Sequence, residues 1–516
     1  MVKALNLIGT VNTPYLPVTG SQRLVYLLLE VDECGAGAHC AERTASVLPG
    51  EREFTRERSS PLHREDGSAL LPVNLVLIVD VSESMHVRVA TEAQFEELAR
   101  TGALQEVLVD GVPAWQPVDV PEELLFRLPR KIDRVRDALQ AVIEQLRPDD
   151  RFALVAFAGR AVTLIPNALV TDSIKHRLFD VVGGLDGLQL GDDTYIGQGL
   201  ALGFEELHRG TSAGLGERAD TGHPPQREEK QSHREARPYL ADRLFVLTDG
   251  FTLDERECRA WARQAQKARV PISTMGLGGE FNEELMIPIA DQTGGEAYLL
   301  EDPEDISPAF AQELHRAQAV RYRNLELKLR FPRGVEVRAA YRVRPSIAPL
   351  DSVNEENSYS FALGDLVAGE SPALLLELIV PPRSVGVYRL AQALLACDDP
   401  AGGLAGLKTR SDVVVEYTTD PDQVSRRVAR VMHVIEALSA YKLQRRAQDD
   451  LAAGDVEGAT RKLRTAATRL LDMGNETLAA EMEREAENLE RRGRADPMRT
   501  KKLRYETRKL TQGLEE

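Results

Sequence analysis

The chain has 516 residues, of which 43% are hydrophobic and 28% charged, and its formal net charge at pH 7 is −17. Such a length exceeds what one hydrophobic core can organise and predicts about three domains. The acidic balance argues against a general binder of nucleic acids or anionic membranes, so neither partner is expected. No apolar run approaches the roughly 20 residues of a membrane span, and the amino terminus lacks a signal peptide's apolar core. We therefore expect a cytoplasmic protein.

Residues 1–65 are predicted to hold β-strands, at 3–8 and 23–31, separated by loops that are rich in Gly, Pro and Ser. These strands are too few to be stable alone, and we expect them to form part of a β-sandwich. The four cysteines, Cys34, Cys40, Cys258 and Cys397, show no zinc-site spacing. His39 together with Cys34 and Cys40 makes at most a partial metal site. Free thiols in a reducing compartment are the simpler interpretation.

Residues 75–79, LVLIV, predict a strand buried on both faces, as in a parallel sheet. Asp80 ends this strand, and Ser82 and Ser84 follow in the next loop. At the carboxyl end of a strand, this spacing lets one carboxylate and two hydroxyl groups converge on a hard divalent cation. The pattern is weak by itself, because Asp and Ser are common in turns.

Residues 86–130 follow the motif and include a short amphipathic segment at 92–100 and a predicted hairpin at 106–118. Because this insertion leaves from the loop of the motif, it must lie near the rim of the site. It is either a surface decoration or a lid that offers an internal carboxylate. The candidates for that carboxylate are Glu83, Glu92, Glu96 and Asp110.

Strands and helices then alternate to residue 320, which predicts a doubly wound, mostly parallel α/β sheet of the Rossmann-like kind. Thr194 lies in a Gly-rich loop that opens a helix, and Asp249 ends a second buried strand. Residues 209–238 are nearly free of apolar side chains and predict a flexible insertion. The expected helices lie at 131–146, 173–182, 196–207, 254–268, 282–292 and 303–320, and the expected strands at 151–158, 161–165, 244–247, 270–276 and 296–300.

These separated motifs resemble a von Willebrand factor A (vWA) domain of bacterial type over residues 72–320. The resemblance implies a metal-ion-dependent adhesion site. Its ligands would be Asp80, Ser82, Ser84, Thr194 and Asp249. It further implies Mg²⁺ as the cofactor, with Mn²⁺ or Ca²⁺ as alternatives, and a protein partner whose Asp or Glu completes the coordination of the metal.

Residues 321–418 change to a period of two, which predicts about six strands of a β-sandwich. The amino-terminal strands are expected to complete it, so that the vWA-like domain is inserted into the sandwich or flanked by it. Residues 420–516 predict a helical bundle, with helices near 422–453, 456–472, 475–492 and 497–511. We interpret the basic residues of the last helix as a solvated face that pairs with acidic residues.

We interpret the chain as a metal-dependent protein–protein interaction scaffold, possessing no catalytic role. Around the metal motifs only His86 could act as a general base, and it is more simply interpreted as a loop residue. The sequence contains no nucleophile elbow, phosphate loop or zinc-protease helix. Resemblance leaves two alternatives open. One is a vWA subunit of a AAA+ ATPase machine, as in chelatase-like or signalling systems. The other is a Ro-like RNA-binding scaffold, which the short helical region and the acidity disfavour.

Overall fold

The structure is a computed structural model that describes residues 4–34, 71–88, 98, 100, 104–109, 112–117, 128–213, 240–355 and 358–512. The chain divides into two compact units. An α/β unit comprises Leu71–Ala319, and a second unit comprises Met1–Leu70 together with Val320–Glu516. In sequence, therefore, the α/β unit is inserted between the two parts of the other unit.

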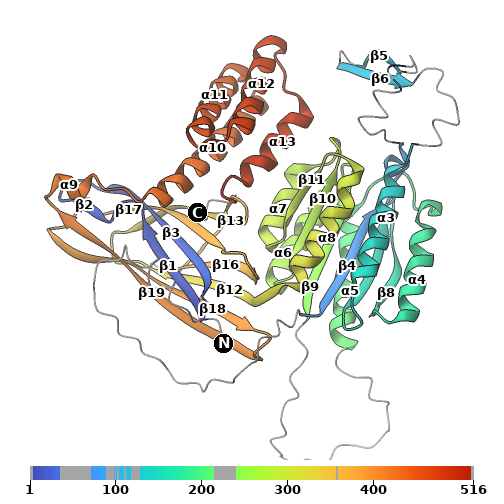
Figure 1. Ribbon diagram of the computed structural model, residues 1–516, viewed down its shortest axis with the longest axis horizontal. Coiled ribbons are helices and arrows are strands. Elements are labelled where there is room, and N and C mark those ends of the chain that lie inside the picture. The colour runs from blue at the N-terminus through green and yellow to red at the C-terminus, as the bar shows by residue number, and fades with distance from the viewer. Residues whose placement is uncertain are drawn as a thin grey trace, which may run out of the picture. The chain divides into compact units, whose positions relative to one another are not determined.

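A six-stranded sheet forms the centre of the α/β unit (Figure 1). Its order is β11-β10-β9-β4-β7-β8, and all neighbours run parallel except β7 and β8. The prediction of a doubly wound, mostly parallel sheet is confirmed. The strands are β4 (Val73–Asp80), β7 (Arg151–Phe157), β8 (Ala161–Leu169), β9 (Ala241–Thr248), β10 (Ile272–Leu277) and β11 (Ala297–Leu300).

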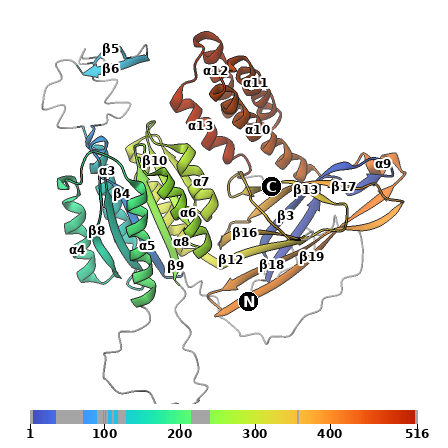
Figure 2. The ribbon, with the colours of Figure 1, turned by 180° about the vertical axis from the view of Figure 1, so that it is seen from behind.

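Helices cover both faces of this sheet, with α3, α4 and α8 on one face and α5, α6 and α7 on the other (Figure 2). Strand β4 is buried along its whole length, because both of its faces contact helices. On the second face, Gly199 and Gly203 let α5 approach Ile78 closely: a Cβ atom at either glycine would lie within 3 Å of that side chain. The helices are α3 (Lys131–Gln145), α4 (Asp172–Gly183), α5 (Ile196–Ala213), α6 (Glu255–Ala268), α7 (Glu283–Thr293) and α8 (Ile306–Gln318), with short 3₁₀ turns η2 (Glu83–His86), η3 (Leu185–Gly187) and η4 (Pro303–Asp305).

The first predicted insertion, residues 86–130, contains a two-stranded antiparallel sheet of β5 (Leu104–Val109) and β6 (Val112–Pro117). This hairpin agrees with the one expected at 106–118. Of the predicted segment 92–100, only residues 98 and 100 are described, and both are helical. The candidate carboxylates Glu92, Glu96 and Asp110 lie outside the described residues.

The second insertion begins later than the predicted residue 209, because α5 continues to Ala213. Two contacts explain the longer helix. Arg209 forms an ion pair of 2.9 Å with the buried Glu206. Gly210 packs so closely on Asn167 that a Cβ atom there would lie 2.5 Å from the Oδ1 atom. The rest of this insertion, residues 214–238, lies outside the described part of the chain.

The second unit contains two mainly antiparallel sheets, ordered β1-β3-β17-β13-β14 and β15-β16-β12-β18-β19-β2. Side chains from both sheets share one hydrophobic core, which makes the pair a β-sandwich. The strands are β1 (Ala4–Val11), β2 (Tyr15–Pro17), β3 (Arg23–Cys34), β12 (Val320–Arg330), β13 (Glu336–Arg344), β14 (Ala348–Pro349), β15 (Val353–Glu355), β16 (Ser358–Val367), β17 (Ala373–Val380), β18 (Gly386–Asp399) and β19 (Leu404–Thr418).

The amino-terminal strands take part in both sheets of the sandwich. Strand β3 lies between β1 and β17, and β2 pairs in parallel with β19. Leu27 and Leu29 of β3 face the sandwich core, whereas Leu28 belongs to the core shared with the helices. Both faces of β3 are therefore buried, which explains why its sequence is a continuous apolar run without alternation.

The carboxyl-terminal helices pack on the outer face of this sheet, through a core that includes Leu28, Val343 and Leu375. The predicted helix at 422–453 is divided in two. Its break lies at residues 425–428, where the backbone N–H of Val428 donates to the carbonyl of Asn12 instead of continuing a helix. The helices are α9 (Pro421–Val424), α10 (Ala429–Ala452), α11 (Val456–Asp472), α12 (Glu476–Arg492) and α13 (Pro497–Arg508).

The basic face expected on the last helix is only partly solvated. Lys501 and Arg508 are buried, and the carbonyl of Arg508 accepts a hydrogen bond from the N–H of Ile347 in the sandwich. Arg499 forms an ion pair of 3.4 Å with Glu481. Among the described residues, no helix is both long enough and apolar enough to cross a membrane.

Candidate metal centre

The predicted ligands Asp80 and Asp249 lie at the carboxyl ends of two neighbouring strands of the α/β sheet: Asp80 is the last residue of β4, and Asp249 directly follows β9. Strands β4 and β9 run parallel, with Val79 paired to Leu247, so Asp80 lies opposite Thr248. From β4 the chain continues to β7 on one side, whereas β9 is the neighbour on the other side. This is a topological switch point, where the loops after the two strands diverge and leave room for a ligand.

The Asp80 carboxylate is fully buried and has a partner on each oxygen. Its Oδ1 atom accepts from the N–H of Ser82 over 2.9 Å, and its Oδ2 atom accepts from the Thr248 hydroxyl over 2.7 Å. Burial raises the pKa of Asp80 to about 6, while the bonds from Ser82 and Thr248 act in the opposite direction. Burial and these two hydrogen bonds therefore act against each other on the Asp80 carboxylate.

A chain of short contacts connects the two serines to the second carboxylate. The hydroxyl groups of Ser82 and Ser84 lie 3.1 Å apart, and the Ser84 hydroxyl donates to Asp249 Oδ1 over 2.6 Å. The Asp249 side chain is completely buried. The structure thus brings Asp80, Ser82, Ser84 and Asp249 together although 165 positions separate Ser84 from Asp249.

Thr194 is held beside these groups by its backbone. Its carbonyl accepts from the N–H of Leu253 over 3.0 Å and from the Thr252 hydroxyl over 3.2 Å, which ties its loop to the loop after Asp249. Its Oγ1 atom faces Gly250, at 3.6 Å from the position of a Cβ atom there. Asp254 fixes the same loop by accepting from the backbone N–H groups of Gly197 and Gln198 in the first turn of α5. All five predicted ligands therefore belong to one cluster of loops.

Two residues of this centre were not found by the sequence reasoning. Thr248 orients Asp80, as described above, and its own Oγ1 atom accepts from the N–H of Gly250. Lys131, the first residue of α3, places its Nζ atom 2.7 Å from Asp249 Oδ2. Thr248 could have been found from the sequence, because it directly precedes Asp249 at the end of the strand that neighbours the strand of Asp80. Lys131 had no such signal, because the insertion separates it from the serine motif.

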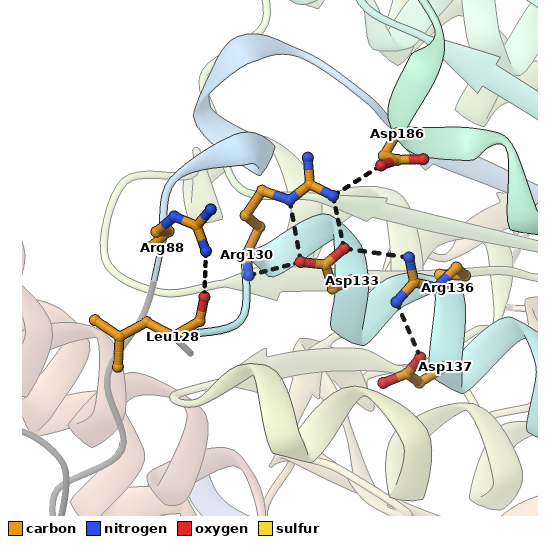
Figure 3. Close-up of polar contacts among 7 residues, drawn as sticks. All are labelled: Arg88, Leu128, Arg130, Asp133, Arg136, Asp137 and Asp186. Atoms are coloured by element: carbon orange, nitrogen blue, oxygen red, sulfur yellow. Dashed lines mark hydrogen bonds and ion pairs between the residues drawn. The ribbon is translucent and has the colours of Figure 1, made fainter. Parts of the chain in front are cut away.

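The ends of the first insertion are fastened together next to Lys131. The N–H of Lys131 donates to the carbonyl of Val87, and Arg88 forms a β-bridge with Arg130. The Arg88 guanidinium also donates to the carbonyl of Leu128 over 2.7 Å (Figure 3). The described parts of both insertion ends thus form one fixed neck beside the site.

Arg130 anchors this neck to the body of the α/β unit. Its guanidinium group bonds both oxygens of Asp133 and reaches Asp186 over 2.8 Å (Figure 3). The hydrogen bonds from Arg130 hold the pKa values of both carboxyl groups below their ordinary range. The start of α3, and Lys131 with it, is therefore fixed by charge-assisted contacts.

The donor set suits a hard divalent cation. It consists only of oxygen atoms, from two carboxylates and three hydroxyl groups. Hydrogen bonds join Asp80 to the backbone of Ser82, the Ser82 hydroxyl to that of Ser84, and the Ser84 hydroxyl to Asp249. Mg²⁺ prefers such oxygen donors and usually retains water at some positions. Among the described residues, no group of three or more His, Cys, Asp or Glu side chains is placed to hold a metal ion, so a metal at this centre would depend on the hydroxyl groups as well as on the two carboxylates.

The remaining candidates of the sequence reasoning lie apart from these contacts. Glu83 is exposed in the 3₁₀ turn η2, next to Ser82, and His86 ends that turn. Cys258 and Cys397 are buried free thiols, and burial raises the pKa of Cys397 to about 11. His39 and Cys40 lie outside the described residues, so the expectation that Cys34 and Cys40 are free thiols stays a prediction.

Comparisons with known proteins agree with this architecture. The model of the von Willebrand factor type A domain matches residues 128–312, and that of the Sll0103-like, C-terminal alpha-helical domain matches residues 429–513. The first match starts at the end of the first insertion and leaves out the segment of Asp80, Ser82 and Ser84. Protein sll0103 of Synechocystis is 26% identical over 451 residues, which are 86% of each chain.

Two solved structures share the fold over nearly the whole chain. A von Willebrand factor type A protein from Catenulispora acidiphila has a TM-score of 0.65 at 16% identity, with 98% of this chain and 97% of that one covered. The ArnB paralog VWA2 from Sulfolobus acidocaldarius has a TM-score of 0.50 at 16% identity, with 98% and 99% covered. The chain therefore contains a von Willebrand factor type A domain, matched over residues 128–312, and a carboxyl-terminal helical domain of the Sll0103-like type, matched over residues 429–513.

Proposed function

We propose that the chain is a protein-interaction scaffold that binds a partner through a divalent metal, with Mg²⁺ as the expected ion. Asp80, Ser82, Ser84, Thr194 and Asp249 would hold the metal. When bound, it supplies an electrophilic position that a carboxylate from the partner can occupy. The observation that carries the proposal is the chain of contacts from Asp80 to Asp249 at the switch point of the sheet.

The electrostatics of the centre support this role. Burial is the main cause of the raised pKa of Asp80, and the charge of the neighbouring Asp249 carboxylate adds to it. A divalent cation compensates both charges, and an incoming Asp or Glu then makes a charge-assisted contact in a partly desolvated setting. The candidate ligands are carboxylate and hydroxyl oxygen atoms, which are the donors that a hard divalent cation prefers, and we infer a binding role without catalysis.

A direct test is the binding of Mn²⁺, a paramagnetic substitute for Mg²⁺, to the purified full-length protein. We expect Asp80→Ala to abolish this binding. Glu144→Ala removes an exposed carboxylate from α3 and is the matched control, which should bind Mn²⁺ like the wild type. Asp80→Ala binding Mn²⁺ with unchanged affinity would contradict the assignment of the centre.

The partner's dependence on the metal needs a second measurement. Cross-linking in cell extract, with Mg²⁺ or with EDTA, should give a partner that is captured by the wild type and by Glu144→Ala. The same partner should be lost with EDTA and with Asp80→Ala. Mutating its acidic residues one at a time should then identify the residue that reaches the metal. A partner retained under all these conditions would move the interaction to another surface. A AAA+ ATPase among the captured proteins would favour the chelatase-like alternative.

A further inference from the structure

Lys131 brings a second cation to the candidate metal centre. Its Nζ atom donates to Asp249 Oδ2 over 2.7 Å, and the two side chains are 16% and 0% exposed. Since the Ser84 hydroxyl donates to Oδ1 of the same carboxylate, both oxygens of Asp249 are engaged. We propose that Lys131 competes with the metal for Asp249, so that tight metal binding requires an acidic ligand. This inference rests on the proposed function.

The charge balance explains the requirement. Two ionised carboxylates and one ammonium group give the metal-free centre a formal charge of −1, and a divalent cation changes it to +1. A carboxylate from outside then neutralises the centre. Without Lys131, the metal alone would bring the charge to zero, and an incoming carboxylate would make it negative. Lys131 therefore weakens the binding of the metal by itself and strengthens the binding of metal and acid together.

The position of Lys131 is determined by the fold and does not depend on its side chain alone. Its backbone N–H is bonded to the carbonyl of Val87, in the neck that closes the first insertion. The preceding residue, Arg130, is anchored by Asp133 and Asp186. The ammonium group is thus presented to Asp249 from a rigid helix start, and its low exposure reduces screening by solvent and salt.

A purely structural role of Lys131 predicts the opposite effect on metal binding. If the ammonium group only oriented the Asp249 carboxylate for the metal, its removal would weaken metal binding, as is usual for residues that support metal ligands. If it competes with the metal, its removal strengthens binding. The direction of the change in affinity therefore separates the two roles.

The experiment measures Mn²⁺ affinity of the full-length protein by electron paramagnetic resonance, in chloride and in acetate at equal ionic strength. In chloride, we expect Lys131→Met to bind Mn²⁺ about tenfold more tightly than the wild type, from the loss of one nearby like charge. Lys131→Arg keeps the charge and should stay near the wild type. Lys131→Gln is a second neutral variant, in case Met disturbs the fold. Acetate should tighten Mn²⁺ binding to the wild type more than to either neutral variant.

The opposing outcomes are distinct. Neutral variants that bind Mn²⁺ equally or less tightly than the wild type would refute the competition. An equal effect of acetate on all variants, or no effect on any, would refute the coupling to an acidic ligand. Asp80→Ala and the double variant Asp80→Ala/Lys131→Met serve as references. If these still bind Mn²⁺, the metal centre itself is wrongly assigned, which is a failure of the proposed function.

Discussion

Thr248→Val tests the candidate metal centre at a residue outside the predicted set of ligands. The Thr248 hydroxyl donates to Asp80 Oδ2 over 2.7 Å, and both side chains are fully buried. Valine has nearly the same shape, so the substitution removes the hydrogen bond while largely preserving the packing. A hydrogen bond to a charged group contributes about 1.5–3 kcal/mol. Loss of a residue that orients a metal ligand lowers metal affinity by roughly 10-fold to 100-fold.

The same substitution should change the pH dependence of metal binding. The metal binds the ionised form of Asp80, so affinity should fall as the pH drops through the pKa of about 6. The bond from Thr248 lowers that pKa against the effect of burial. In Thr248→Val the pKa is therefore higher, and the loss of Mn²⁺ affinity should begin at a higher pH than in the wild type.

Isothermal titration with Mn²⁺ at several pH values between about 5 and 8 measures both effects. Thr248→Ser is the matched control, because it retains the hydroxyl group and should bind Mn²⁺ nearly as tightly as the wild type. Circular dichroism and thermal unfolding would check that each variant is folded. If Thr248→Val and Thr248→Ser share one affinity and one pH profile, the structure's account of how Asp80 is oriented is wrong.

Three further predictions concern the rest of the fold. Glu30→Ala removes a buried carboxylate that forms ion pairs with both Arg344 and Arg430. It should lower the free energy of unfolding by about 3 kcal/mol, and a decrease of less than about 1 kcal/mol measured by calorimetry would contradict this. Gly295→Ala places a Cβ atom 2.1 Å from the Ile272 carbonyl oxygen. Chemical denaturation should show the α/β unit destabilised by about 1–3 kcal/mol. Gly187 has open space around it, so the control variant Gly187→Ala should have almost no effect. Burial raises the pKa of Glu485 in the folded protein. The protonated side chain therefore stabilises the fold below the pKa of Glu in the unfolded chain, and this stabilisation is lost as the pH rises through the pKa of the folded state. Glu485→Gln should therefore raise the melting temperature at pH 8 but not at pH 4, and equal shifts at both values would refute this.

Much of the α/β unit could be predicted from local sequence. The apolar run before Asp80 and the one before Asp249 each specify a buried strand, because a strand between two helical layers has no polar face. The spacing of Ile132, Val135, Leu139 and Val142 predicts the buried side of α3, and the structure buries all four. Since strands of a parallel sheet end at one edge, these local signals also predicted which residues gather at the candidate metal centre.

Other features depend on contacts between distant parts of the chain. The break between α9 and α10 is made by a hydrogen bond to Asn12, which no local pattern near residue 428 indicates. The extension of α5 to Ala213 depends on packing against Asn167 of β8. Lys131 lies beside Asp249 only because the neck of the insertion returns the chain to the edge of the sheet. The strands that carry Asp80 and Asp249 could therefore be predicted from the sequence, since buried apolar runs follow from short-range periodicity, whereas the set of candidate ligands came from the resemblance of the motifs to a vWA domain. The position of Lys131 at the centre depends on the tertiary structure, because it follows from how an insertion closes.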